Sequence, residues 1–286
     1  MANLKEIRNR ITSIGSTMQI TSAMKMVSAA KLKKAQDAIT SMRPYASKLT
    51  ELLQNLSATL DSDLGGEYSS QREVKKVLMV VVTSNRGLCG GFNSSVIKRT
   101  VKNIEENYSN STVELLTIGK KGNDILSKRY NVIENRNDVF DNLTFNVIEE
   151  IAEKLMSLFA DESYDQIELV YNSFKNAATQ VVTVEQFLPL KPIETEKASK
   201  ADYIFEPSKE EIVLALIPKS LKTQLYKAVR DSYAAEHGAR MTAMHKATDN
   251  AKDLRDDLLL TYNKARQAAI TNEILEIVGG AEALNN

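Results

Sequence analysis

The chain has 286 residues, and its hydrophobic content of 43% is enough for a packed core in one large or two smaller domains. Its 37 basic and 37 acidic side chains cancel, so the net charge gives no argument for a nucleic-acid partner. The single cysteine excludes an internal disulfide and favours a reducing compartment, and with no signal pattern or long apolar run we expect a protein that is neither secreted nor membrane-spanning.

Residues 1–60 keep one heptad phase, which predicts a coiled-coil helix. The seam positions are Leu4, Ile7, Ile11, Ile14, Met18, Thr21, Lys25, Ser28, Leu32, Ala35, Ile39, Met42, Ala46, Leu49, Leu53, Leu56 and Leu60. The seam is polar at Thr21, Lys25 and Ser28, where apolar residues such as Met24 and Val27 form a second face. This pattern indicates either a contact with something other than the partner helix or a local stutter in the coil.

The same helix is strongly basic at its start. Between residues 1 and 36 it carries seven basic side chains and one acidic one. Such a helix can bind nucleic acid, anionic lipid or an acidic protein surface, or it can present a solvated face. No aromatic residue interleaves the charges, which disfavours base stacking. Pro44 is expected to kink the helix because proline lacks the backbone N–H.

Residues 61–73 are polar and contain Gly65 and Gly66, which indicates a linker. Beyond it, strands and helices alternate, and this predicts an α/β domain over residues 74–192 with a mostly parallel sheet. Strands are expected at 77–82, 113–118, 132–135, 167–171 and 181–187, and helices at 94–107, 121–130 and 143–160.

The last part of the chain, residues 208–286, predicts a second coiled-coil helix. Ser208 and Glu211 have the spacing of a capping box, and Pro218 is expected to interrupt the helix. The helix should then run from 219 to 278, about 90 Å at ~1.5 Å per residue. Gly279 and Gly280 are expected to stop it. The expected seam is Met244, Ala247, Ala251, Leu254, Leu258, Thr261, Ala265, Ala268, Asn272 and Leu275.

Only residues 1–60 can pair with this helix along its length. The predicted fold class is therefore α/β: a long antiparallel two-helix coiled coil formed by the terminal helices, 1–60 with 208–286, with a Rossmann-like α/β domain inserted at 74–192.

The segment RGLCGGFN (86–93) lies directly after the first strand, where phosphate-binding loops occur. Its glycine spacing fits neither common phosphate-binding motif. Nucleotide binding and a tight turn that lets helix and strand pack closely both stay open. Cys89 as a nucleophile needs a base, and the histidines His237 and His245 lie far along the chain without a cysteine partner. We expect no catalytic residue, no cofactor and no metal ion.

Four motifs resemble those of the gamma subunit of bacterial F-type ATP synthases. They occur in the same order as in that family and are spread over the whole chain. They are ITSAMKMVSAAKL (20–32), TSNRGLCGGFN (83–93), ARMTAMHKATDNA (239–251) and YNKARQAAITNEILEIVGGA (262–281). The resemblance implies a non-catalytic rotor shaft inside a ring of alternating alpha and beta subunits. It implies an α/β foot bound to the epsilon subunit and the membrane c-subunit ring, and catalytic nucleotide sites in the beta subunits.

The resemblance also implies functional residues and a location. The residues expected to contact the beta subunits are Met24, Lys25, Val27, Lys31, Arg266, Gln267, Thr271 and Glu273. The foot residues expected to contact the c ring and the epsilon subunit are Tyr203, Ile204, Phe205 and Glu206. We expect a peripheral protein on the cytoplasmic face of the bacterial inner (plasma) membrane, touching the membrane only through the c ring and binding no nucleic acid. The driving ion, proton or sodium, is not decided by this sequence. The rival interpretations are a coiled-coil adaptor without a rotary role and a nucleotide-binding enzyme.

Overall fold

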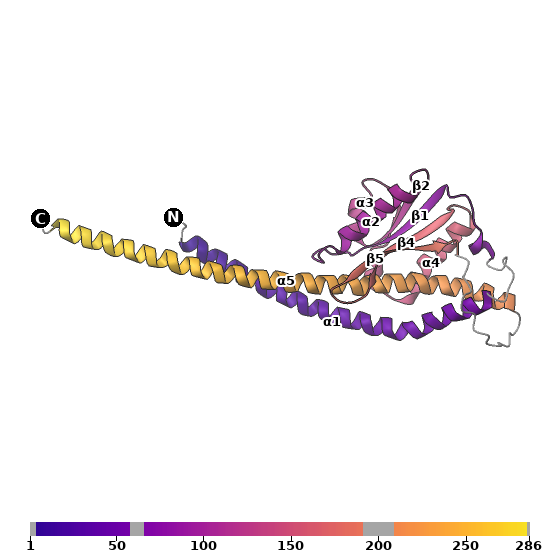
Figure 1. The fold of residues 1–286 in the computed structure, drawn as a ribbon, viewed down its shortest axis with the longest axis horizontal. Helices are drawn as coiled ribbons and strands as arrows, with labels where there is room; N and C mark the ends of the chain where they lie inside the picture. The colour runs from indigo at the N-terminus through magenta and orange to yellow at the C-terminus, as the bar shows by residue number, and fades with distance from the viewer. Residues whose placement is uncertain (1–3, 58–65, 191–208, 285–286) are drawn as a thin grey trace. The chain divides into compact units, whose positions relative to one another are not determined.

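The computed structural model describes residues 4–57, 66–190 and 209–284. Two long helices, α1 (Leu4–Ser57) and α5 (Lys209–Leu284), flank an α/β region in the chain (Figure 1). That region contains β1 (Lys76–Val82), α2 (Phe92–Asn107), β2 (Thr112–Ile118), α3 (Lys120–Leu126), β3 (Asn131–Asn135), α4 (Phe145–Ala160), β4 (Gln166–Phe174) and β5 (Gln180–Leu188), with short 3-10 turns η1 (Gly66–Ser69) and η2 (Asp138–Phe140). The predicted fold class is confirmed.

The chain forms two compact units, Met1–Ser28 with Met241–Asn286 and Ala29–Arg240. The division falls inside both long helices, whereas the sequence divides the chain by secondary structure into 1–60, 74–192 and 208–286. That three-part division stays a prediction, and each unit is described by itself below.

The first unit is an antiparallel pair of helices. Arg8 donates a hydrogen bond from its guanidinium to the hydroxyl of Tyr262 at 2.7 Å, and the hydroxyls of Thr21 and Thr248 are 2.8 Å apart. A step of thirteen residues up one helix thus matches a step of fourteen down the other. A pair of helices shows this relation when they run in opposite directions, so the predicted pairing is confirmed.

The predicted seam of α1 is also confirmed, because every described side chain on it is buried or half-buried. The polar positions keep the phase, with Ser28 only 3% exposed and its hydroxyl donating to the carbonyl of Met24 at 2.8 Å. There is therefore no stutter. Of the apolar residues beside the seam, Ile20, Met26 and Val27 are 60%, 65% and 58% exposed.

The predicted seam of α5 is wrong at five positions, because Leu254, Thr261, Ala268, Asn272 and Leu275 are all exposed. At the first two of these, the next residue along the chain takes the seam position. Leu254 is 51% exposed and Thr261 is exposed, whereas their neighbours Arg255 and Tyr262 are half-buried. Arginine and tyrosine bury an apolar stem and keep a polar end in water, so they fill seam positions that an apolar pattern does not reveal.

Two predicted helix interruptions are wrong as well. Pro218 lies inside α5, and the helix continues past Gly279 and Gly280 to Leu284. A proline costs one backbone hydrogen bond and a glycine about 1 kcal/mol in a helix, which neighbouring turns outweigh. α1 also runs through Pro44 as one helix, and the kink expected there stays a prediction. Ser208, the predicted cap of α5, lies outside the described residues.

The second unit is built on a five-stranded sheet with the order β3-β2-β1-β4-β5. All neighbouring strands are parallel except β4 and β5, which are antiparallel. One face of β1 packs against α2 and α3 through Val77, Met79 and Val81, and the other through Leu78, Val80 and Val82 against α4 and α5. The central strand is therefore buried on both sides, as its unbroken apolar run predicts.

The N-terminal half of α5 is part of this core. Its side chains Ile217, Leu221, Leu225, Ala228 and Val229 are at most 5% exposed and pack on the sheet with α4. At about 1.5–3 kcal/mol for each large buried side chain, this contact is a main source of stability for the unit. The helix predicted only as half of a coiled coil is thus also a core element of the α/β domain.

Candidate functional site

The β1–α2 loop, residues 83–91, lies where the strand order reverses between β1 and β4. In open α/β sheets, ligands bind outside the carboxyl ends of the strands at such a point. Two loop residues have a left-handed backbone, Leu88 with φ of 61° and Gly90 with φ of 58°. The loop returns the chain sharply into α2, where the amide N–H of Phe92 donates to the carbonyl of Cys89 at 3.3 Å.

In this protein α5 itself fills the crevice. Ala235 and Ala239 pack against Cys89 and Phe92 of the loop and against Phe174 at the end of β4. Small residues are needed at these positions of α5 because the helix lies close to the backbone of the β4–β5 turn. A Cβ atom added to Gly238 would lie 3.1 Å from the carbonyl oxygen of Ala177 in the β4–β5 turn and 3.2 Å from its Cα.

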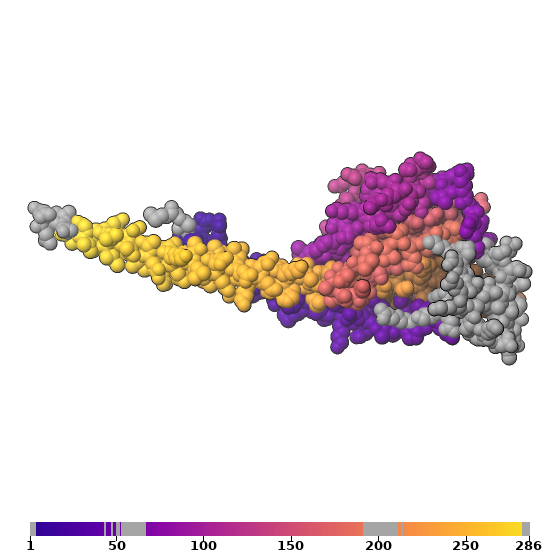
Figure 2. Space-filling model, viewed as in Figure 1, coloured from indigo at the N-terminus to yellow at the C-terminus, as the bar shows by residue number. Residues whose placement is uncertain are grey.

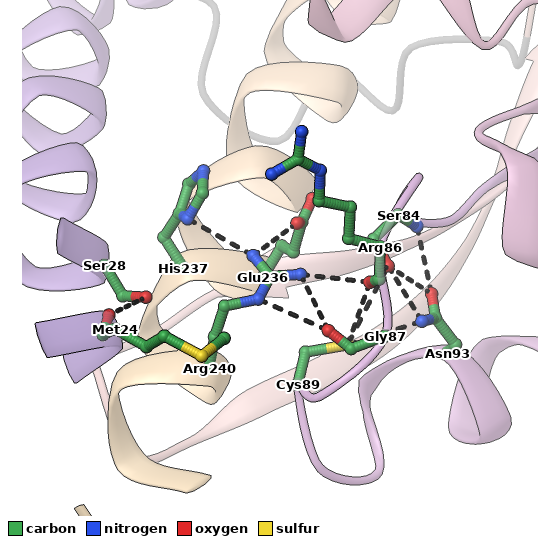
Figure 3. Close-up of polar contacts among 10 residues, drawn as sticks. All are labelled: Met24, Ser28, Ser84, Arg86, Gly87, Cys89, Asn93, Glu236, His237 and Arg240. Carbon is green, nitrogen blue, oxygen red and sulfur yellow. Dashed lines mark hydrogen bonds and ion pairs between the residues drawn. The ribbon is translucent and has the colours of Figure 1, made fainter. Parts of the chain in front are cut away.

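One buried side chain of α5, Arg240, holds the loop (Figure 3). A terminal nitrogen of its guanidinium donates to the carbonyl oxygen of Arg86 at 3.0 Å and to that of Gly87 at 3.3 Å, and Nε donates to Gly87 at 3.4 Å. A phosphate-binding loop directs N–H groups at an anion. This loop directs carbonyl oxygens at a cation, so its chemistry is the reverse of a nucleotide site.

The second terminal nitrogen of Arg240 forms an ion pair with Glu236 at 2.6 Å, and both side chains are 9% exposed. Burial raises the pKa of the Glu236 carboxyl, although Arg240 opposes the shift. Such a buried pair is sensitive to the loss of one member, because the other is left charged and unpaired.

His237 lies in the same corner as the loop. Its Nδ1 is 3.4 Å from the Arg240 guanidinium, and its ring meets that of Tyr233 edge-on with centroids 4.5 Å apart. Burial, with the positive charges of Arg240 and Lys31, lowers the pKa of His237 to about 3. The imidazole is therefore neutral at physiological pH.

The thiol of Cys89 is 2% exposed. Asn93 donates its side-chain amide to the sulfur at 3.3 Å, and the hydroxyl of Ser84 is 3.8 Å away. Burial raises the pKa of the Cys89 thiol despite the hydrogen bond from Ser84 and the charge of Arg240. The fold brings His237 to the same corner of the unit as Cys89, although the two residues lie far apart in the chain. A buried thiol with a raised pKa is nevertheless a poor nucleophile.

Further polar contacts join α5 to the α/β domain, among them those of Lys222 and Arg230. Lys222 forms ion pairs with Glu149 at 2.7 Å and Glu153 at 2.6 Å, and Arg230 donates to the carbonyl of Leu143 at 2.9 Å. On the other side of α5, a groove of about 490 Å³ separates it and β5 from α1. The groove is lined by Ile39, Met42, Ala46, Leu49, Glu185, Ser220, Thr223, Gln224, Lys227 and Asp231. The α/β domain is therefore fixed to α5 more closely than to α1.

The predicted contact residues lie at separate places. Met24 and Lys25 are half-buried, and Val27 and Lys31 are exposed on α1. Arg266, Gln267, Thr271 and Glu273 are all exposed on α5, and the Thr271 hydroxyl donates to the carbonyl of Gln267 at 2.9 Å. Within the described ranges Arg266 forms no ion pair, which disfavours a merely structural pairing on its own coil. The predicted foot residues Tyr203, Ile204, Phe205 and Glu206 lie outside the described residues.

Sequence reasoning missed the residues of the loop corner, Glu236, Gly238 and Arg240. A signal was present in the run of small residues Ala234, Ala235, Gly238 and Ala239. Their spacing of three and four marks one helix face that approaches another surface closely. The partner of that face, 150 residues earlier in the chain, is not visible in such a pattern.

The comparisons with known proteins agree with this architecture. A family model described as ATP synthase matches residues 3–284. The ATP synthase gamma chains of Flavobacterium psychrophilum and Flavobacterium johnsoniae are 73% and 72% identical over 285 and 286 residues, covering 99% and 100% of each chain.

Solved structures show the same fold. A chain of the central stalk and c ring of the Tetrahymena thermophila mitochondrial ATP synthase is 29% identical, with a TM-score of 0.61 over 80% of this chain and 99% of that one. A chain of the Euglena gracilis mitochondrial ATP synthase is 22% identical, with a TM-score of 0.69 over 98% of this chain and 94% of that one.

The fold is thus that of a central-stalk chain, two long helices with an inserted α/β domain. Together with the identities above, it identifies the family plainly: the chain belongs to the ATP synthase gamma chains. It is a non-catalytic subunit of that complex. Across the described residues, no helix has the length and apolar character needed to cross a bilayer.

Proposed function

We propose that the chain is the central-stalk rotor subunit of an F-type ATP synthase that translocates protons or sodium ions. It transmits torque between the c-subunit ring in the membrane and the catalytic alpha–beta head. Membership of the gamma chain family supports this role. The antiparallel coil of the first unit is suited to it, because two paired helices resist bending and twisting better than one.

One observation carries the proposal, the bare C-terminal end of α5. Every residue from 266 to 281 is exposed, and Figure 2 shows the last turns of the helix, in yellow, extending past the indigo start of α1. Large apolar side chains lie on it, namely Ile270, Ile274, Leu275, Ile277 and Val278, each between 48% and 66% exposed. An apolar surface of this extent needs an enclosing partner. A ring of alpha and beta subunits that surrounds the helix and forms few directional bonds with it would provide one and still permit rotation.

The polar residues at the start of this end fit a contact that forms and breaks. Arg266 offers a rigid set of donors, and Gln267 offers a donor and an acceptor. With Thr271 and Glu273 they would hold a beta-subunit loop at one rotary angle and release it at the next. On α1, the exposed Met26, Val27 and Lys31 would meet the moving part of the beta subunits, with Met24 and Lys25 beside them. An acidic beta surface would complement the basic start of α1.

The α/β domain would be the foot. Residues 203–206 would seat on the c ring and the epsilon subunit, at the cytoplasmic face of the bacterial inner membrane. The subunit would therefore reach the membrane only through the ring. Which ion drives the machine would be set by the c subunits rather than by this chain.

Purification of the complex through a tag on this chain tests the proposal. We expect one copy for each ring of alternating alpha and beta subunits, together with epsilon and the c ring. Vesicles that hold the complex should couple an ion gradient to ATP synthesis. Recovery of the ring with full coupling after the chain is removed would leave only an adaptor role.

A separate variant tests the foot. Glu206→Lys should lower ATP-driven ion pumping more than it lowers stability, since a reversed surface charge usually changes stability by less than about 0.5 kcal/mol. Unchanged pumping in membrane vesicles would remove the foot assignment and leave the shaft untouched.

A further inference from the structure

The β1–α2 loop contains a leucine in an unfavourable conformation. Leu88 has φ of 61° and is 65% exposed, so no burial of its side chain offsets the cost of the left-handed backbone. A bulky residue keeps such a conformation only when the surrounding structure imposes it. The residues on either side must therefore be held firmly.

The holding contacts come from two directions. Before Leu88, the carbonyls of Arg86 and Gly87 accept hydrogen bonds from Arg240, and the Ser84 hydroxyl donates to Arg86 at 2.7 Å. After it, Cys89 is buried against Ala235 and Ala239 of α5. Arg240 is in turn fixed by its ion pair with Glu236, one turn earlier on the same helix.

We propose that Arg240 is a positioning residue that latches the β1–α2 loop onto α5. The loop then has two states. In the closed state Arg240 bonds the two carbonyls, Leu88 is strained and Cys89 is buried. In the open state the carbonyls are released to water, Leu88 relaxes to an ordinary backbone conformation and the Cys89 thiol becomes accessible. The latch sets the balance between these states.

This inference goes beyond the rotor role and does not depend on it, because it concerns the isolated full chain. Two opposing effects set the loop's equilibrium: the hydrogen bonds donated by the Arg240 guanidinium favour the closed state, and the backbone strain at Leu88 favours the open state. A guanidinium that serves two carbonyls and a buried carboxylate keeps all three satisfied only while the loop is closed. Removing it leaves the Gly87 carbonyl without the guanidinium and the Arg86 carbonyl with the Ser84 hydroxyl but no charged donor, which favours opening.

The chain provides its own reporter, because Cys89 is its only cysteine. The rate at which Ellman's reagent modifies the thiol in the full-length chain measures the fraction of open loop. We expect slow modification in the parent chain. The double variant Glu236→Gln/Arg240→Met removes both members of the ion pair, so that no buried charge is left alone. It should react at least about ten-fold faster, since each factor of ten requires only ~1.4 kcal/mol.

Three further variants separate the latch from general loosening. Arg240→Lys keeps the charge but not the forked geometry, and its rate should fall between the parent and the double variant. Lys222→Met breaks a different polar contact of α5, with Glu149 and Glu153, and should leave the rate at the parent value. Leu88→Gly removes the strain, and added to the double variant it should slow the reaction.

Low urea concentrations distinguish local opening from global unfolding. The rate of the double variant should stay nearly constant from zero to about 1 M urea, because local opening exposes little surface. A parent thiol that reacts as fast as a free thiol would overturn the proposal. So would an unchanged rate in the double variant, an equal increase in Lys222→Met, or a rate that rises with urea as the fraction of unfolded chain rises.

Discussion

The two halves of α5 have opposite surroundings, although they belong to one continuous helix. Between Ile217 and Arg240 most residues are buried or half-buried, against the sheet or the β1–α2 loop. From Arg266 to Ala281 every residue is exposed, and several of them are large and apolar. The first half is held by packing and by the contacts of Lys222, Arg230 and Arg240, whereas the last turns make no such contacts in the described structure. A helical sequence pattern therefore does not show which part of a helix is packed against a domain and which part is exposed. The surrounding structure determines this difference.

The largest expected effect compares one leucine from each half. Leu225 is 0% exposed and Leu275 is 63% exposed. Leu225→Ala should lower the free energy of unfolding by about 2–5 kcal/mol, because it removes buried contacts and leaves a cavity. Leu275→Ala should change it by less than about 0.5 kcal/mol. Urea unfolding of the full chain measures both, and equal losses would contradict the contrast.

Glycines in the two halves should respond with opposite signs. Gly238→Val places side-chain atoms against the backbone of Ala177 and should cost about 1–3 kcal/mol. Gly280→Ala adds a methyl group where no atom lies within 4 Å, and should stabilise the helix by up to ~1 kcal/mol. Thermal melting of each variant beside the parent provides the comparison. A Gly238→Val protein with an unchanged melting temperature would show that α5 and the β4–β5 turn are not in close contact.

The buried half should also determine how stability depends on pH. The pKa of His237 is about 3 in the folded state and about 6.5 in the unfolded state. Below pH 6.5 the unfolded chain therefore binds a proton that the folded chain does not, so stability decreases as the pH falls. By linkage the loss is about 2 kcal/mol at about pH 5. His237→Gln should remove this part of the pH dependence. An identical slope in the variant and in the parent would assign the effect to other groups.

The smallest effect on stability should come from Arg266, and the largest on turnover. Arg266→Ala changes an exposed side chain, so the melting temperature should stay within error of the parent. If the residue holds a beta-subunit loop through a charged hydrogen bond, about 1.5–3 kcal/mol is lost at that contact. ATP turnover of the assembled complex should then fall. Normal turnover with a lower melting temperature would return Arg266 to a structural role.

Features of the fold that depend on the residues of one segment can be predicted from the sequence, whereas those that depend on contacts between distant segments cannot. The seam of α1 and the five strands follow from the period of apolar residues, which each segment shows by itself. The apolar pattern of α5 does not reveal Arg255 and Tyr262 as seam residues, because their side chains are amphipathic. Pro218, Gly279 and Gly280 predict interruptions of α5, but intrinsic helix propensity is a weak signal that tertiary packing overrides.

The loop corner could be predicted only in part. The glycine-rich segment is recognisable from its place after β1, and its glycine spacing disfavours a phosphate site. That Arg240 occupies the crevice could not be inferred, because the contact joins positions 154 residues apart and depends on where α5 crosses the sheet. The exposed end of α5 fits the seam pattern equally well, because the spacing of Ala268, Asn272 and Leu275 does not show whether a partner helix covers them.

Rotation is the most direct test of the central claim, that a segment fastened to the α/β domain drives a free end inside the catalytic ring. The ring is fixed to a surface, a gold particle is attached to the α/β domain, and the angle of the particle is recorded during ATP hydrolysis. The account predicts stepwise rotation in one direction that stops when ATP is removed. Steady hydrolysis with a particle that only fluctuates about one angle would contradict it.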